Sequence, residues 1–470
     1  MGKIIKSVFL GWLVLSIVTL PFYWPFIRMF WVFLPSIEAP DYEPPATAVE
    51  ARLQDIDYLT TLTNYDRSFD EDEKRAFAEH LERAAAAADE MNDAEFYLAL
   101  AEAVALAGNG HTNVSYRPQY TEFDTIGARL YTFSDGVFIV RAAPEHAEWL
   151  GHRVVAVDGV PIEDLQAAMA KYKGGNDTWR KLYSTLLIES PELLAASGEV
   201  ISPAGFELTL EDPSSDATQV VSFPAMDADS MPDQPWRAAW HTLDPEVSNP
   251  LYDGWSHVLG ADEAAVPNYL TTPNVPMSYA LENNGLYIRA LPGFEAGDTT
   301  IQKAYKAMLA DHEDGSLDYL VIDFRLHDGG DYTKSMGFSK AAPKKVKDDG
   351  DIYIITGPNT FSAGIVTVAM LKHHAGDRGV IIGEQLGDYE QFWAERGGSF
   401  RLPNSEYYIN YATGYHDWEN GCKGEPFCYT MNEMFETPAG SLAPGVPVPM
   451  DFSSYSQGRD VVMEWVDVRH

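Results

Sequence analysis

Cysteine is scarce in this chain: its 470 residues include only Cys422 and Cys428, in the segment CKGEPFC. Two cysteines are too few for a zinc site, and the CxxC pair typical of a thiol redox centre is absent. Their close spacing favours a disulfide that closes a short loop in an oxidising compartment. Metal binding and a redox role are the less favoured alternatives. Such a bond would fix a local loop and not the whole fold.

Positive charge is also in short supply, with 33 lysine and arginine residues against 70 aspartate and glutamate residues, a formal net charge of −37. A chain this acidic repels nucleic-acid phosphates and anionic lipid surfaces, so we expect neither a nucleic-acid partner nor a basic membrane-binding patch. Metal-ligand motifs such as HExxH are missing, and His327, His373 and His374 have no comparable spacing. We therefore expect no metal and no cofactor.

One long apolar run is present, and it lies at the N-terminus, Ser7 to Leu34, after Lys3 and Lys6. Within it, Val8–Ile27 carries no charge and is long enough to span a bilayer. No small-x-small cleavage site follows. We therefore expect an uncleaved signal anchor over residues 1–36, with the lysines inside and the remainder outside the cytoplasm, in the periplasm for example. A cleaved signal peptide followed by secretion is the alternative.

The rest of the chain divides by composition and by hydrophobic period. A proline-rich stretch is followed by helical patterns, in which Asn92 and Glu95 form a capping-box pattern before a stripe of apolar residues. Alternating β-type segments come next, and then a loop-rich stretch precedes an α/β pattern. We predict a linker, a helical N-terminal domain, a β-rich domain, connecting loops and an α/β core at residues 37–48, 49–118, 119–225, 226–275 and 276–470.

Three apolar runs in the last region predict parallel strands, YLVIDF at 319–324, DIYIIT at 351–356 and GVIIGE at 379–384. Near-continuous apolar runs of this length are typical of strands that are covered on both faces. A helical pattern beginning SAGIVTVAM connects the second run to the third. This order predicts a parallel strand pair with a crossover helix.

A serine stands where the second of these strands turns into the helix, Ser362 in NTFSAG. The unpaired N–H groups and the positive dipole end of a helix start favour developing negative charge there, and the N–H of Ala363 is placed to help hold an oxyanion. Serine is also a frequent helix N-cap. This segment alone favours a cap over a nucleophile.

The segment DFRLHDGGD, at 323–331, shifts that balance toward a nucleophile. It follows the first strand, so its glycines lie at the carboxyl edge of the same sheet, where open α/β sheets bind their ligands. Paired glycines let the backbone turn sharply and approach a substrate. Gly329 or Gly330 would therefore supply the second N–H of an oxyanion hole.

Several segments, taken in order, match one family: GNGHTNV at 108–114, DFRLHDGG at 323–330, and NTFSAG followed by VIIGEQLGD at 380–388. They resemble the C-terminal processing (tail-specific) peptidases and their tricorn-core relatives. GHRVVAVDGVPI, at 151–162, resembles the PDZ-type module of that family, and PGVPVPMDFSSYSQGRDVVMEW resembles its closing strand and final helix. The resemblance implies a helical N-terminal region, a PDZ-like module and a crotonase/ClpP-like α/β core.

Two subgroups of that family deprotonate the serine differently. The processing peptidases use a lysine in a Gly-Lys-Gly motif after the third strand, but here that neighbourhood reads GEQLGDYEQF, with Gly387 and Asp388 where lysine is expected. Lys372 lies too far along the helix that begins at Ser362 to replace it. The tricorn-like subgroup uses a histidine from the segment equivalent to GNGHTNV. This resemblance implies His111 as the base, and an imidazole has a suitable pKa.

The tricorn-like subgroup orients its histidine with a serine just before it and with an acid from late in the catalytic domain. Gly110 stands in place of that serine here. Candidates for the acid lie in YATGYHDWENGC, where Glu419 is favoured and Asp417 is close behind; Glu433 and Glu436 are less favoured. Such an acid would hold the imidazole in the productive tautomer.

These observations predict a membrane-anchored serine peptidase that cleaves peptides or protein C-terminal tails through an acyl-enzyme. The PDZ-like unit would receive a chain end by strand addition or control access to the site. Two alternatives are a catalytically inactive peptide-binding protein on the same scaffold and an esterase. The sequence sets no oligomeric state.

Overall fold

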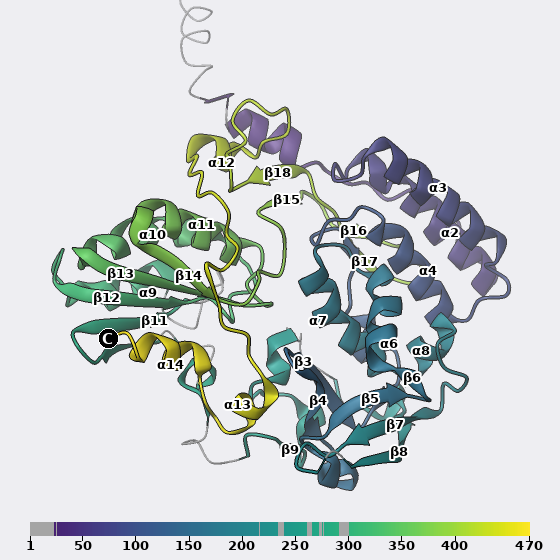
Figure 1. Cartoon of the computed structure of the whole chain (residues 1–470). Helices are drawn as coiled ribbons and strands as arrows, with labels where there is room; N and C mark the ends of the chain where they lie inside the picture. The colour runs from purple at the N-terminus through teal and green to yellow at the C-terminus, as the bar shows by residue number, and fades with distance from the viewer. Residues whose placement is uncertain are drawn as a thin grey trace, which may run out of the picture.

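The computed structural model describes residues 23–24, 26–215, 217–233, 239–260, 266–271, 275, 277–290 and 300–470. Figure 1 shows an α/β lobe, largely green, beside a lobe in which the N-terminal helices adjoin a β-rich part. The strands β15 (Gln391–Ala394) and β18 (Gly414–Asp417) lie between the lobes on one side, and α13 (Phe452–Ser456) lies between them on the other. The chain is therefore a multidomain α/β protein.

The helical region consists of α2 (Ala48–Leu59), α3 (Glu71–Ala86) and α4 (Asp93–Ala105). The capping box at the start of α4 is confirmed, because Asn92 accepts the N–H of Glu95 and the Glu95 carboxylate accepts the N–H of Asn92. The predicted stripe of Phe96, Leu100 and Val104 is buried. The helix ends before GNGHTNV, whose first glycine has φ +60°.

The β-rich unit is a twisted antiparallel sheet with the strand order β2-β8-β7-β5-β4-β3. The short β6 pairs with β5 through an Asp-Gly turn, as the sequence pattern predicts, and β9 pairs with β4. The helices α6 (Ile162–Met169), α7 (Asp177–Ile188) and α8 (Pro191–Ser197) pack beside it. Its strands span Thr125–Ile126 (β2), Ala128–Phe133 (β3), Gly136–Ala142 (β4), Arg153–Val157 (β5), Val160–Pro161 (β6), Gly205–Glu211 (β7), Thr218–Met226 (β8) and Ser256–His257 (β9).

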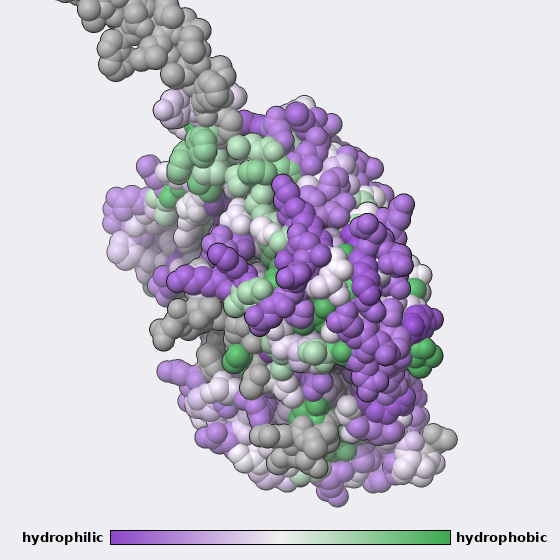
Figure 2. Space-filling model, turned by 90° about the vertical axis from the view of Figure 1, so that its left-hand side faces the viewer, coloured by the Kyte–Doolittle hydropathy of each residue, from purple (hydrophilic) through white to green (hydrophobic). Residues whose placement is uncertain are grey.

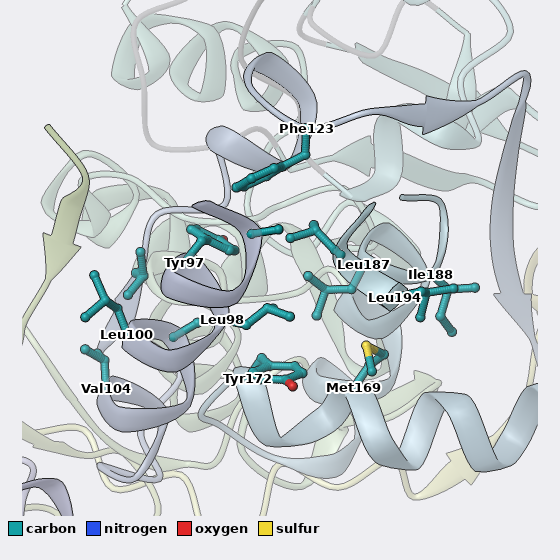
Figure 3. Close-up of a cluster of buried hydrophobic side chains, with 14 of the residues drawn as sticks. Tyr97, Leu98, Leu100, Val104, Phe123, Met169, Tyr172, Leu187, Ile188 and Leu194 are labelled. Carbon is teal, nitrogen blue, oxygen red and sulfur yellow. The ribbon is translucent and has the colours of Figure 1, made fainter. Parts of the chain in front are cut away.

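The helical region and the β-rich unit share one hydrophobic core. Figure 3 shows side chains of α4, such as Tyr97 and Leu98, next to Leu187 and Leu194 of α7 and α8. The stretch between the unit and the α/β core, predicted as connecting loops, also contributes buried side chains, among them Trp240, Leu251 and Tyr269. These loops pack into the interior because their large aromatic and leucine side chains require burial.

The α/β core is a six-stranded sheet with the order β10-β11-β12-β13-β14-β19. Apart from the β10–β11 hairpin its strands are parallel, which confirms the three predicted parallel strands. Helices α9, α10 and α11 pack on one face and α14 on the other. The bounds are Met277–Leu281 (β10), Gly285–Arg289 (β11), Leu317–Asp323 (β12), Val346–Thr356 (β13), Gly379–Gly383 (β14), Val446–Pro447 (β19), Ile301–Ala310 (α9), Met336–Ala341 (α10), Ala363–Ala375 (α11) and Val461–Asp467 (α14).

After β14 the chain leaves this sheet and returns to the helical region. The pair β15–β18 lies between the lobes, and β17 (Tyr408–Asn410) joins β1 (Asn113–Val114), which follows the GNGHTNV segment, and β16 (Phe400–Arg401). A disulfide links Cys422 to Cys428 and closes a short loop ahead of α12 (Thr430–Met434). This excursion brings segments from both halves of the chain to one place.

The predicted membrane anchor over residues 1–36 lies mostly outside the described residues. In the parts of the chain that the structure describes, no helix has the length and apolar character required to span a bilayer. The described part contains η1 (Met29–Phe33), whose Phe33 is buried against Tyr429, while Trp24, Phe26 and Trp31 are exposed. Figure 2 shows apolar surface gathered at this end of the molecule.

Candidate active site

Ser362 occupies the turn between β13 and α11 in a backbone conformation that L residues rarely adopt, with φ 52° and ψ −120°. Its side chain makes no capping hydrogen bond to α11. Because a left-handed conformation is strained in a residue that has a Cβ, it persists only where neighbouring structure enforces it, and such strain is frequent at catalytic serines on strand-to-helix turns. This geometry favours a nucleophile over a cap.

The loop after β12 enforces that turn. The backbone oxygen of His327 accepts the N–H of Phe361 at 3.1 Å, and the carbonyl of Phe324 accepts the Thr360 hydroxyl at 2.9 Å. Gly364 leaves room for this contact, because a Cβ there would lie 2.3 Å from the His327 oxygen. The FRLHDGG segment therefore fixes the position of the serine.

The predicted oxyanion residues surround Ser362. Gly329, at φ +138°, packs directly on the serine, since a Cβ at Gly329 would lie 3.3 Å from Ser362 Cβ and 3.7 Å from its Oγ. Gly330 lines the same cavity as the serine. Ala363 is the first residue of α11, where a backbone N–H has no partner within the helix. The structure therefore places Gly329, Gly330 and Ala363 next to the serine.

His111 is held in a stack of aromatic rings. Its imidazole lies between Phe361, at a centroid distance of 4.4 Å, and Phe392, at 5.1 Å, with interplanar angles of 25° and 15°. The stack continues to Trp179 beyond Phe361 and to His416 beyond Phe392. Because Phe361 precedes Ser362, this stack ties the position of the imidazole to the serine turn.

The carboxylate beside His111 belongs to Asp388. Its Oδ2 lies 3.6 Å from the histidine Nδ1, and its side chain is 1% exposed. This separation exceeds hydrogen-bond length. Within the described residues, neither ring nitrogen of His111 has a hydrogen-bond partner, and Asp388 Oδ2 also has none. Catalytic hydrogen bonds are often long in an unliganded site and shorten when a substrate binds.

Gly110 allows this approach. A Cβ at position 110 would lie 2.6 Å from Asp388 Oδ2 and 3.0 Å from the Phe361 ring. A side chain at this position would displace the carboxylate. The absence of a side chain at Gly110 therefore leaves room for the Asp388 carboxylate beside His111.

Glu419 and Asp417, the acids favoured from sequence, are engaged elsewhere. The carboxylate of Glu419 accepts a hydrogen bond from Gln391 at 2.6 Å. Asp417 accepts the backbone N–H groups of Glu419 and Asn420 and so closes the turn after β18. Neither acid lines the cavities around Ser362.

Ser362 stands between two cavities. The first, of about 430 Å³, contains His111 together with Lys173, Tyr116 and Tyr183. The second, of about 410 Å³, lies on the other side of the serine and is lined by Val366, Phe392, His416 and Tyr429, among others. Gly330, Ala394 and Glu395 line both. An extended chain that crosses the serine would fill one cavity on each side.

The histidines considered for a metal site, His327, His373 and His374, do not form one. His327 is buried, and burial lowers its pKa to about 4, while the His373 ring contacts the Pro438 carbonyl oxygen at the surface. Across the described residues no group of three or more histidine, cysteine or acidic side chains is arranged to hold a metal ion.

Sequence reasoning did not identify Asp388, Lys173, Phe361 or Phe392 as parts of the site. One signal was available for Asp388: it follows β14 at the carboxyl edge, where the serine and the glycine loop also lie. Phe361 stands next to Ser362 in sequence, but no local pattern marks it as part of the site, and Phe392 and Lys173 come from other segments.

The fold and the site define a class: a multidomain α/β chain in which a strained serine at the carboxyl edge of a parallel sheet shares a cavity with a histidine that is distant in sequence. No protein-family model matches the sequence, and no curated protein matches it. Among solved structures, the chain is similar to mature CPAF in complex with lactacystin, with 13% identity, 90% of this chain and 98% of that chain covered, and a TM-score of 0.54.

Two further structures are similar over nearly the whole chain. A second structure of mature CPAF has 12% identity, covers 89% of this chain and 96% of that chain, and gives a TM-score of 0.54. The photosystem II D1 C-terminal processing protease has 14% identity, covers 89% and 99%, and gives a TM-score of only 0.34. The shared fold is that of mature CPAF.

Proposed function

We propose that the chain is a serine peptidase in which Ser362 is the nucleophile, His111 the general base and Asp388 the acid behind it. The observation that carries the proposal is the strained serine between two cavities, with the stacked His111 lining one of them. What supports a Ser-His over a Ser-Lys mechanism is the neighbourhood in which the Ser-Lys subgroup has its lysine, since this chain has Gly387 and Asp388 there.

The reaction follows from these positions. Ser362 Oγ attacks the scissile carbonyl carbon while His111 takes the hydroxyl proton, which forms a tetrahedral intermediate. The C–N bond then breaks, and His111 returns the proton to the leaving amine, which leaves an ester on Ser362. Water attacks this ester with His111 again as base, and the acid product and the free serine result. Asp388 stabilises the imidazolium in both acylation and deacylation.

The oxyanion would be held by backbone donors. The donors would be the N–H of Ala363 at the start of α11 and an N–H from Gly329 or Gly330, residues that lie next to the serine. Such fixed donors act without reorganisation, and each contributes on the order of 100-fold or more to the rate. The positive end of α11 adds to the stabilisation.

Peptide hydrolysis tests the proposal. Purified protein is incubated with a mixture of peptides, and new termini are identified by mass spectrometry. The proposal predicts cleavage by the wild type but not by Ser362→Ala. Ser230→Ala is the control and should also cleave, because Ser230 is exposed and lines neither cavity. Cleavage by Ser362→Ala at the wild-type rate would reject the mechanism.

The unliganded distance of 3.6 Å between His111 and Asp388 supports a second candidate, an inactive peptide-binding protein on the same scaffold. Peptide binding without turnover by the wild type would identify it. An esterase would use the same residues, so ester and amide substrates with one acyl group must be compared.

We further propose that the N-terminal segment holds the protein at a membrane, with the catalytic region outside the cytoplasm. The exposed Tyr23, Trp24 and Trp31 are the side-chain types found at bilayer interfaces, and the disulfide fits an oxidising compartment. N-terminal sequencing of the mature protein tests whether the segment is retained. We expect the mature protein to keep its N-terminal segment and to remain with the membrane fraction. A shortened chain released from the membrane would contradict the proposal.

A further inference from the structure

Lys173 lies in the same cavity as Ser362 and His111, and it has no role in the proposed mechanism. Its side chain is buried, with 9% of the residue exposed. The amine lies 4.6 Å from the ring centroid of Tyr183, 5.1 Å from that of Tyr116 and 5.9 Å from that of Trp179. In the described part of the chain no carboxylate lies within ion-pair distance of Nζ.

The segment that carries Lys173 is built against the catalytic loops. Gly175 donates its N–H to Gly108 at 3.1 Å, and a Cβ at Gly174 would lie 2.5 Å from the oxygen of Asn109. The next residue, Asn176, donates to the carbonyl of Leu386 at 3.0 Å. The position of Lys173 is therefore fixed relative to both the His111 segment and the Asp388 segment.

A buried amine without an anionic partner costs free energy, so a fold that holds one in a cavity has a use for it. The aromatic cage offers only part of what the amine loses by leaving water. Burial lowers the pKa of Lys173 to about 7, although the charge of Asp388 acts in the opposite direction. An arriving carboxylate would supply the missing partner and keep the amine protonated.

The other charged groups that line the cavity are not suited to bind a substrate carboxylate in place of Lys173. Arg396 is exposed, and its guanidinium donates to Asn410. Asp328 and Glu395 also line the cavity, and as acids they repel a substrate anion and leave Lys173 as its buried attractor. A substrate carboxylate would therefore be drawn to one end of the cavity.

The side of the scissile bond follows from the mechanism. His111 must deliver its proton to the leaving nitrogen, so the leaving segment lies on the His111 side of the serine. The cavity on that side is the one that contains Lys173, whereas His111 does not line the second cavity.

From this geometry we infer that Lys173 is a specificity residue that binds a carboxylate on the leaving segment of the substrate. This inference rests on the proposed function. The carboxylate comes either from the C-terminus of the cleaved chain or from an acidic side chain downstream of the scissile bond. In the first case the enzyme releases short C-terminal pieces whose length the cavity sets.

Four versions of one cleavable peptide test the inference: a free C-terminal carboxylate, a C-terminal amide, and two amidated versions with glutamate or glutamine downstream of the cut. The wild type should show a KM lower by about 10- to 100-fold for a carboxylate version than for its neutral partner. A preference for the free C-terminus identifies the chain end as the ligand. A preference for glutamate identifies the side chain. Equal KM values across the four would overturn the inference while leaving the peptidase intact.

The variant Lys173→Met keeps an apolar chain in the aromatic cage and removes the charge. We expect it to lose the carboxylate preference through KM, with kcat on the amidated peptide retained. Lys171→Met is the matched control, because Lys171 is two residues away, is more exposed and contacts Glu102 instead. Loss of turnover on every peptide by Lys173→Met, with fluorophosphonate still reacting at Ser362, would overturn the inference by assigning the amine to the chemistry.

The pH profile adds a readout that a merely structural lysine would not move. A carboxylate binds the protonated amine. The preference for the carboxylate peptide, measured as the ratio of the KM values of the amidated and carboxylate versions, should therefore fall by up to about tenfold per pH unit above pH 7. The amidated peptide shares the effects of His111, Asp388, Asp328 and Glu395, so the ratio of the two KM values isolates Lys173. A ratio that is constant from pH 6 to pH 9 would contradict the inference. Failure of the wild type to cut any of the four peptides would instead count against the proposed function.

Discussion

The Oδ2 atom of Asp388 lies 3.6 Å from Nδ1 of His111, although the two residues are far apart in sequence. Asp388 enters from the loop after β14, and His111 enters from the segment after α4. Gly110 leaves room for the pair, because a Cβ at this position would lie 2.6 Å from Asp388 Oδ2. This pair, in a cavity that Ser362 also lines, is the relationship on which the proposed chemistry depends.

Replacing Asp388 by asparagine should lower kcat strongly. The amide would keep the volume but could no longer stabilise an imidazolium, and comparable changes cost on the order of 1,000- to 10,000-fold. Steady-state hydrolysis of an amidated peptide measures the effect. Glu419→Gln is the matched control, because Glu419 contacts Gln391 and not His111, and it should stay within a few-fold of the wild type. The reverse ranking would return the acid role to Glu419.

Replacing Gly110 by alanine should disturb the contact between His111 and Asp388. The new Cβ would overlap Asp388 Oδ2, so either the carboxylate or the His111 segment must move. We expect a fall in kcat of at least about tenfold and a loss of about 1–3 kcal/mol of unfolding free energy, as for overpacked interiors. Peptide kinetics and urea unfolding measure the two quantities. Wild-type kcat in the variant would show that Asp388 need not approach His111.

Replacing Phe392 by leucine should loosen the imidazole. One of its two stacked neighbours is lost, and aromatic pairs of this geometry contribute about 0.5–1.5 kcal/mol. We expect slower reaction of Ser362 with a fluorophosphonate, by about two- to tenfold. Phe123→Leu removes a ring that packs on Tyr97 in the N-terminal core, and it should leave the reaction rate unchanged. Equal rates in all three proteins would deny the stack an orienting role.

Arg325 should anchor the C-terminal helix α14 to the core. Its guanidinium contacts Asp323 and Asp460, and Asp460 also caps α14 through the N–H groups of Val462 and Met463. Asp460→Ala leaves a buried cation partly unpaired and should cost about 3–5 kcal/mol. Denaturant unfolding measures the loss. Asp467→Ala, on the same helix but without the arginine contact, should cost far less; equal losses would contradict the account.

Stability should depend on pH through Glu384. Burial raises the pKa of this carboxyl to about 7, so the folded protein favours the protonated form. The resulting stability is fully present below the unfolded pKa, near pH 4.5, and is lost as the pH rises through about 7. Glu384→Gln should therefore gain about 2–3 kcal/mol relative to the wild type at pH 8 and nothing at pH 4.5. Denaturant unfolding at the two pH values measures both, and an equal gain at both would contradict the sign.

The fold was predictable where the signal is local. The strands β12, β13 and β14 read as apolar runs because both of their faces are covered, by α9–α11 on one side and α14 on the other. The capping box of Asn92 and Glu95 was equally readable. The shared core of α4 with α7 and α8 was not, since it depends on packing between segments that carry no joint pattern.

The site was predictable in part for the same reason. Ser362 and Gly329 follow neighbouring parallel strands, so their meeting at one sheet edge follows from topology. Asp388 is marked in the sequence only by the absence of a lysine, whereas the resemblance to the tricorn-like subgroup points to the later acids Glu419 and Asp417. Lys173 carries no sequence signal at all; its significance depends on the burial and the aromatic rings that tertiary structure provides.

The reaction of Ser362 with a fluorophosphonate, followed by intact mass and peptide mapping, tests the central claim most directly. The probe needs an activated serine but no particular substrate side chain. The account predicts one adduct, on Ser362, and a rate at least about 1,000-fold slower in His111→Ala, since the base supplies most of the activation. Absence of an adduct in the folded wild type, or equal rates in the two proteins, would contradict it.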